Sequence, residues 1–147
     1  LVPPYSPDSS HHGTSSAIEF AVKDLGVREI VILGHHKCGG VQAMRSIHQG
    51  NKLEDREFIG AWMALAEDAC AMHGADDPGS EAAVEMVTIK TSIRNLKSFP
   101  WILSRVDDGS LRLHGWWFDI NTGNMLAHDP KTGQFSIVDS VPDLMGK

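Results

Sequence analysis

The chain has 147 residues, of which 41% are hydrophobic and 22% charged, the composition of a soluble globular protein with room for a hydrophobic core. A formal net charge of −6 without a cluster of Lys and Arg argues against nucleic acid as a partner. No apolar stretch approaches the roughly 20 residues of a membrane span, so we expect no membrane partner. The two cysteines, Cys38 and Cys70, are too few for a disulfide framework and fit a reducing compartment, so we expect a cytoplasmic location.

The first third of the chain predicts a helix, a strand and a second helix. Apolar residues recur at helical spacing over 14–25, where the Ser and Thr residues at 14–16 can cap the helix and Glu19 can complete a capping box. The segment 28–36 is apolar without alternation, which is typical of a parallel strand buried on both faces. After a glycine-rich turn, 41–50 predicts a short helix. This order of elements is typical of an α/β fold.

Two longer helices, 54–73 and 80–98, are expected in the middle of the chain. The apolar stripe of the first consists of Phe58, Trp62, Leu65 and Ala69, and that of the second of Met86, Ile89, Ile93 and Leu96. A short helix over 101–109 precedes three strands separated by the turn sequences NTG and KTG, at 111–120, 125–129 and 134–138. The predicted fold class is α/β, with a mainly parallel central sheet flanked by helices and an antiparallel edge strand or hairpin at the C-terminal end.

The segment GHHKCGG at 34–40 places His35 and Cys38 at the carboxyl end of the predicted strand. Imidazole and thiolate are good zinc ligands, and a glycine-rich turn lets two side chains three positions apart converge on one ion. The carboxyl end of a parallel strand is also where open α/β sheets place their binding sites. The pattern therefore makes His35 and Cys38 candidate metal ligands.

Two other interpretations of this turn remain open from the residues alone. Cys38 can be a buried thiol beside a hydrogen-bonded His35. Alternatively, Cys38 can be a nucleophile with His35 as its base and glycine amides as an oxyanion hole. The spacing does not match a phosphate-binding loop.

The turn sequence GHHKCGGVQAM resembles the metal-binding turn of the β-class carbonic anhydrases, whose pattern is Gly-His-x-x-Cys-Gly after a buried strand. The resemblance continues in LVPPYSP near the start, in GTSSAIEFAVKDLGVREIVILGH before the turn, and in SIRNLKSFPWI and LHGWWFDINTGNMLAHDP after it. It covers nearly the whole chain and implies one domain over residues 1–147.

The resemblance implies a zinc ion held by two cysteines and one histidine, with a fourth position for water, hydroxide or an aspartate. His35 and Cys38 match two of these ligands. The family's other cysteine belongs to a Cys-x-Asp-x-Arg motif, whose Asp and Arg act in catalysis, and these 147 residues do not contain that motif. Cys70 lacks the neighbouring Asp and Arg, and we interpret it as a core residue. The expectation is therefore a domain lacking its N-terminal segment. His11 and His12 are interpreted as surface residues, with His36 pointing away from the site.

The activity that the resemblance implies is the reversible, zinc-dependent hydration of carbon dioxide to bicarbonate and a proton, weak or absent in this chain alone. Phe20 matches a pocket-lining aromatic position, although a plain core role fits it equally, and the Gly39 amide matches a position near substrate. Family members form homodimers or larger homo-oligomers, so the expected partners are CO2 or bicarbonate and further copies of the chain. Two alternatives stay open: the same zinc site acting on another small linear molecule such as carbon disulfide, and a metal-free, non-catalytic relative.

Overall fold

The computed structural model describes residues 1–51, 57–66 and 80–138. In chain order the elements are α1 (Gly13–Glu19), the π-helical turn η1 (Phe20–Asp24), β1 (Glu29–His35), α2 (Gly39–His48), α3 (Ile59–Met63), the 3₁₀ turn η2 (Ala64–Ala66), α5 (Ser80–Leu96), α6 (Pro100–Asp107), β2 (Arg112–Phe118), β3 (Met125–His128) and β4 (Phe135–Ile137). No helix in these ranges is long and apolar enough to cross a membrane.

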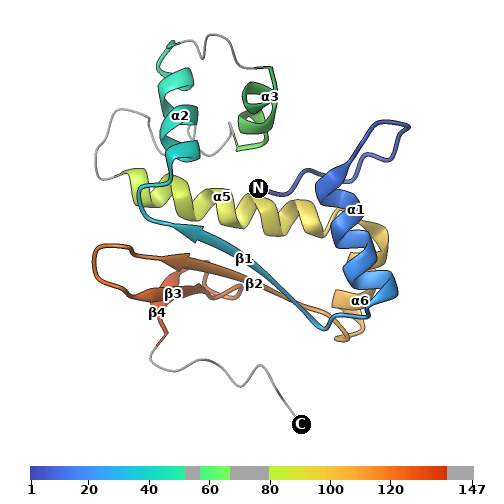
Figure 1. Cartoon of the computed structure of the whole chain (residues 1–147). Coiled ribbons are helices and arrows are strands. Elements are labelled where there is room, and N and C mark those ends of the chain that lie inside the picture. The colour runs from blue at the N-terminus through green and yellow to red at the C-terminus, as the bar shows by residue number, and fades with distance from the viewer. Residues whose placement is uncertain (52–56, 67–79, 139–147) are drawn as a thin grey trace.

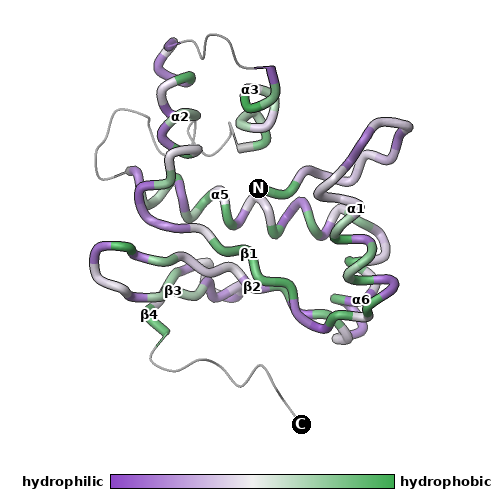
Figure 2. Tube along the Cα trace, in the orientation of Figure 1, coloured by the Kyte–Doolittle hydropathy of each residue, from purple (hydrophilic) through white to green (hydrophobic). Residues whose placement is uncertain are grey.

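The described strands form one mixed sheet in the order β1-β2-β3-β4. β1 and β2 are parallel, whereas β2–β3 and β3–β4 are antiparallel, which confirms the α/β class and the antiparallel C-terminal end. β1 is hydrophobic over residues 30–33 (Figure 2) but is not buried on both faces as predicted, since Val31 is 37% and Leu33 60% exposed. The reason is that successive side chains of a strand point to opposite faces: Ile30 and Ile32 pack against the core, whereas Val31 and Leu33 point to the other face.

α5 packs on the sheet across β1 and β2 (Figure 1). Its buried Ile89 approaches two strand glycines so closely that a Cβ on Gly34 would lie 2.7 Å from the Ile89 Cδ1, and one on Gly115 would lie 2.8 Å from its Cγ2. The residues facing these glycines across the ladder, Trp117 and Ile32, point to the same face of the sheet. The missing side chains at 34 and 115 therefore set how closely α5 approaches the strands.

The two C-terminal hairpins use the same turn twice, which confirms the NTG and KTG signals. Asp119 accepts hydrogen bonds from the backbone N–H of Asn121 at 2.9 Å and from the Thr122 hydroxyl at 2.8 Å. Ten residues later Asp129 accepts the corresponding bonds from Lys131 N–H at 2.8 Å and Thr132 Oγ1 at 3.0 Å. The glycine after each threonine has φ near +70°, a conformation that glycine adopts without strain.

The first helix begins differently from the prediction. Its N-cap is His12 without a side-chain cap, so the capping box expected from the residues at 14–16 is wrong. The helix starts one residue earlier, at Gly13, and the Ser16 N–H bonds to the His12 carbonyl at 2.8 Å. Glu19, which was to complete the box, instead pairs with Lys23 one turn later at 2.5 Å.

The predicted helix over 54–73 is described only in part, as α3 followed by η2. In this part the predicted apolar stripe is wrong, because Phe58 is 83% and Trp62 37% exposed, whereas Met63 is buried. Met63 packs with Val41, Met44 and Val84 in a cluster between α2, α3 and α5. Ala69 and Cys70, with the core role predicted for Cys70, lie outside the described residues.

Candidate metal centre

His35 and Cys38 flank the turn between β1 and α2, where His35 is the last residue of the strand and Cys38 the N-cap of the helix. The His35 Nδ1 lies 3.0 Å from the carbonyl oxygen of His36. A carbonyl can only accept, so Nδ1 carries the proton in this tautomer and Nε2 presents a lone pair. A hydrogen bond of this kind is what orients a metal-ligating histidine.

The backbone of the turn between the two residues includes one left-handed residue and is fixed by hydrogen bonds. Lys37 has a positive φ of 57°, a conformation that costs a non-glycine residue about 1–2 kcal/mol. The His36 N–H donates to the Phe118 carbonyl oxygen at 2.8 Å, and the Cys38 carbonyl accepts from Gln42 N–H at 3.0 Å. These bonds tie the turn to β2 on one side and to α2 on the other.

A third contact comes from α5, where the buried Glu85 accepts a hydrogen bond from the Cys38 N–H at 2.9 Å. Its second carboxylate oxygen accepts from the Trp117 indole N–H, also at 2.9 Å. Sequence reasoning missed Glu85, although a signal was present: it precedes Ile89 by four residues and so shares the buried face of its helix. A carboxylate on such a face needs hydrogen-bond donors inside the protein.

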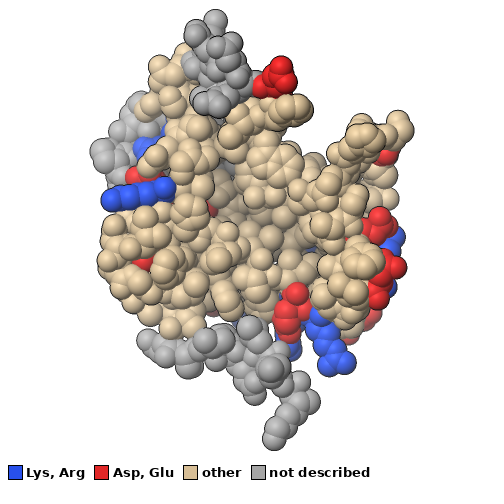
Figure 3. Space-filling view, in the orientation of Figure 1, with Lys and Arg blue, Asp and Glu red and all other residues tan. Residues whose placement is uncertain are grey.

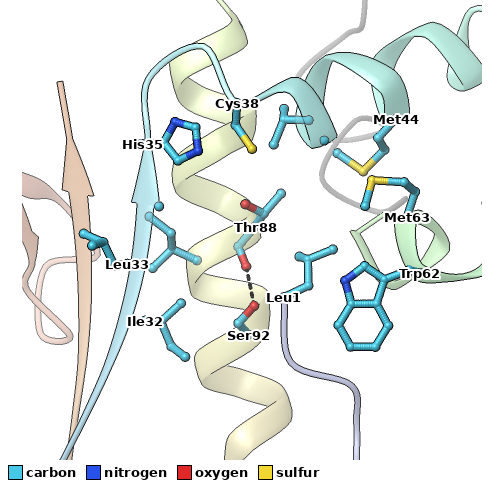
Figure 4. Close-up of a pocket in the computed structure, with 14 residues that line it drawn as sticks. Leu1, Ile32, Leu33, His35, Cys38, Met44, Trp62, Met63, Thr88 and Ser92 are labelled. Atoms are coloured by element: carbon cyan, nitrogen blue, oxygen red, sulfur yellow. Dashed lines mark hydrogen bonds between the residues drawn. The ribbon is translucent and has the colours of Figure 1, made fainter. Parts of the chain in front are cut away.

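His35 and Cys38 both line one end of a cavity of about 250 Å3 (Figure 4). The side chains drawn along its walls come from β1, α2, α3, α5 and the first residue of the chain: Leu1, Ile32, Leu33, Met44, Trp62, Met63, Thr88 and Ser92. The two hydroxyls among them donate to backbone carbonyls of α5, Thr88 to Glu85 at 2.7 Å and Ser92 to Thr88 at 3.0 Å. The cavity is therefore mainly apolar, with the imidazole and the thiol at one end.

The charged side chains lie mostly elsewhere. On the face shown in Figure 3, Lys, Arg, Asp and Glu gather toward the margins and the centre is almost entirely uncharged. A cavity without a charged wall suits a small uncharged molecule better than an anion or a cation.

The neighbouring His36 points away from the cavity, as predicted, and lies against the first hairpin turn. Its Nδ1 is 3.2 Å from the Asp119 carboxylate and 2.9 Å from the Asn121 amide nitrogen. The backbone N–H of Asn121, followed by the Thr122 hydroxyl, holds the pKa of Asp119 below its usual value. His36 therefore links the turn between β1 and α2 to the β2–β3 hairpin.

Other histidines have partners away from the cavity. His12 pairs with Asp8 at 2.8 Å, and His114 with Glu29 at 2.6 Å. Within residues 1–51, 57–66 and 80–138, no three His, Cys, Asp or Glu side chains are arranged to hold a metal ion. His35 and Cys38 thus have the donor types that zinc prefers, and as two side chains they are fewer than the three protein ligands of a catalytic zinc site.

The two predicted substrate-pocket residues lie outside the lining of this cavity. Phe20 begins η1 and is 56% exposed, and Gly39 begins α2 with no atom within 4 Å of where its Cβ would be. The structure of this chain therefore brings His35 and Cys38 together, while the roles of Phe20 and Gly39 stay predictions.

Comparison with known proteins identifies the family. A family model described as carbonic anhydrase matches residues 1–125. The chain is 33% identical to a carbonic anhydrase of Pseudomonas aeruginosa over 98% of this chain and 65% of that protein, and 32% identical to carbonic anhydrase 1 of Escherichia coli O157:H7 over 92% and 61%.

Among solved structures, the β-carbonic anhydrase CcaA matches with a TM-score of 0.82 and 26% identity over 95% of this chain and 63% of that chain. A tetrameric β-carbonic anhydrase of Sordaria macrospora shares the fold, with a TM-score of 0.65 and 21% identity over 93% of this chain and 64% of that chain. The chain belongs to the β-class carbonic anhydrase family. It spans less than two thirds of the length of these curated relatives.

Proposed function

We propose that the protein catalyses the zinc-dependent, reversible hydration of carbon dioxide, and that His35 and Cys38 are two of the zinc ligands. The observation that carries this proposal is the pairing of an oriented imidazole with a thiol at one end of a mainly apolar cavity. Membership of the carbonic anhydrase family supports it.

Each part of this site has a separate task. Zinc, when bound, supplies acidity, since it lowers the pKa of a coordinated water to about 7. The hydrogen bond at Nδ1 keeps the His35 Nε2 available, and Cys38 presents its sulfur from the N-cap position of α2. The apolar walls admit an uncharged linear molecule such as CO2 and exclude bulk water. The remaining zinc ligand and the Asp–Arg pair of the family motif come, under this proposal, from residues other than these 147.

We also propose that the protein acts as a homodimer or larger homo-oligomer in the cytoplasm. Phe20 and Leu25 are 56% and 65% exposed on the N-terminal helical segment, and Leu33 is 60% exposed on β1. Burying such side chains between copies would remove apolar area from water, at about 25 cal/mol per Å2. Under this proposal Phe20 and the Gly39 amide line the substrate pocket once the copies are assembled. Light scattering after size exclusion, repeated on Leu33→Asp, tests the assembly: a monomeric wild-type protein contradicts it.

The activity is tested by stopped-flow CO2 hydration in the presence of zinc. In a protein that also carries the residues supplying the remaining ligand and the Asp–Arg pair, we expect turnover in wild type, its loss in Cys38→Ser and His35→Ala, and its retention in Cys70→Ser, which removes the other thiol of these 147 residues. Residues 1–147 alone should show weak turnover or none. Carbon disulfide offered as a second substrate separates the two zinc chemistries. Hydrolysis of carbon disulfide without CO2 hydration, or equal rates in wild type and Cys38→Ser, contradicts the proposed function.

A further inference from the structure

We propose that Glu85 is a positioning residue that fixes the orientation of Cys38 and thereby sets the metal affinity of the site. This inference rests on the proposed function, because it treats Cys38 as a ligand. Glu85 is a buried residue of α5 and does not itself line the cavity.

Glu85 is 1% exposed, and both of its oxygens are used. One accepts the Cys38 N–H and the other the Trp117 indole N–H, each at 2.9 Å. Trp117 is itself 6% exposed, so its bond to Glu85 is buried, and the bond from Cys38 is partly buried. A buried carboxylate with a fixed donor on each oxygen has little freedom to move, since displacing it would leave polar groups without partners.

The contact acts on a backbone that needs support. The residue before Cys38 holds a left-handed conformation, with φ of 57° at Lys37. Such a conformation persists where surrounding bonds hold it in place. The Cys38 N–H belongs to the peptide that joins Lys37 to Cys38, so the bond to Glu85 fixes that peptide and, with it, the direction in which the Cys38 side chain leaves the backbone.

The two hydrogen bonds of Glu85 also connect three elements: α5 carries Glu85, β2 carries Trp117, and α2 begins after Cys38. A hydrogen-bonded partner behind a metal ligand typically changes metal affinity 10- to 100-fold when it is removed. Glu85 contacts the backbone N–H of Cys38 and not its thiol, so it acts on the direction of the Cys38 side chain.

The test uses the protein that also carries the remaining zinc ligand and compares zinc affinity, by competition with a chromophoric chelator, in wild type, Glu85→Met and Glu85→Gln. Methionine has a similar length and accepts neither bond strongly, so we expect affinity to fall 10- to 100-fold. Glutamine keeps one strong acceptor and restores part of the loss. The matched control is Glu81→Met, one turn earlier on α5, where the carboxylate bonds to the Gln42 side chain and not to the turn. We expect its affinity to stay within about twofold of wild type.

A second measurement, the chemical shift and exchange protection of the Cys38 amide in the metal-free protein, separates this inference from the proposed function. We expect a downfield, protected amide in wild type that moves upfield in Glu85→Gln. If wild type binds no zinc, the proposed function fails, and the amide alone decides whether Glu85 holds Cys38. An unprotected wild-type amide, or equal zinc affinity in wild type and Glu85→Met, overturns the inference. Should Glu85→Met not fold, Glu85→Gln and the wild-type amide carry the test.

Discussion

Replacing Gly34 by alanine should destabilise the protein through a single identifiable neighbour, Ile89. The new Cβ would lie 2.7 Å from the Ile89 Cδ1 and 2.9 Å from its Cγ1. Carbon atoms in contact are usually 3.5–4.0 Å apart, so the overlap is about 1 Å. Ile89 is 2% exposed, and its Cγ2 already approaches Gly115, so it has little room to turn aside. We expect the free energy of unfolding to fall by about 2–3 kcal/mol, the upper part of the range for overpacked cores.

The cause is tested by shortening Ile89 in the same protein. Ile89→Val alone should cost about 0.5–1.5 kcal/mol, because it leaves a small cavity. It also removes Cδ1, the atom nearest to the new methyl group. The double variant should therefore be less destabilised than the sum of the two single variants, by about 1 kcal/mol.

Urea denaturation of the four proteins in this cycle measures the free energies. Gly13→Ala serves as the control, because a Cβ there meets nothing within 4 Å and φ is not positive. We expect it to be neutral or slightly stabilising. Strict additivity in the cycle, or a Gly34→Ala protein as stable as wild type, would refute the close approach of α5 to β1.

Three further predictions concern single contacts. The Arg112 guanidinium holds the pKa of Glu29 below its usual 4.5, so this pair stabilises the fold above pH 4.5, and the benefit is lost as pH falls through the lowered pKa. Glu29→Gln should cost at most about 1 kcal/mol in thermal unfolding at pH 7, and a cost that does not shrink as the pH falls below 4.5 would contradict this. Lys37 has a positive φ, which glycine adopts without strain and a β-branched residue does not. In urea denaturation, Lys37→Gly should leave the free energy of unfolding unchanged or raise it by up to about 1 kcal/mol, whereas Lys37→Val should lower it. A valine variant more stable than the glycine variant would argue against the positive φ. Asn95→Ala removes the amide that donates to the Val2 carbonyl at 2.8 Å. It should lower the free energy of unfolding by about 1 kcal/mol and speed up hydrogen exchange near the N-terminus. Unchanged exchange there would contradict this prediction.

Much of the fold was predictable because the signals were local. Unbroken apolar character marked β1, and the NTG and KTG sequences marked two turns whose hydrogen bonds are made within six residues. The predicted burial of β1 on both faces was wrong because burial depends on what packs on each face of the sheet. An apolar run can have one face against the core and the other exposed, as β1 does, and its sequence does not distinguish this from burial on both faces.

The position of the candidate site could be predicted from the sequence, but the contacts that support it could not. His35 and Cys38 could be singled out as candidate ligands because both lie within one turn of the sequence. The Glu85 contact joins residues 47 positions apart, and the Trp117 contact joins residues 32 apart. No local pattern encodes which buried carboxylate meets which N–H group, so these partners emerge only from the packing of α5 on the sheet.

The most direct test of the proposed metal centre is the zinc K-edge absorption spectrum of the metal-loaded protein, recorded for wild type, Cys38→Ser and His35→Ala. We expect sulfur scattering at about 2.3 Å and imidazole nitrogen scattering at about 2.0–2.1 Å in wild type. The sulfur contribution should fall by one atom in Cys38→Ser, and the imidazole contribution should fall by one ring in His35→Ala. A spectrum that neither substitution changes would show that zinc binds elsewhere, and would contradict the claim that this turn is the metal centre.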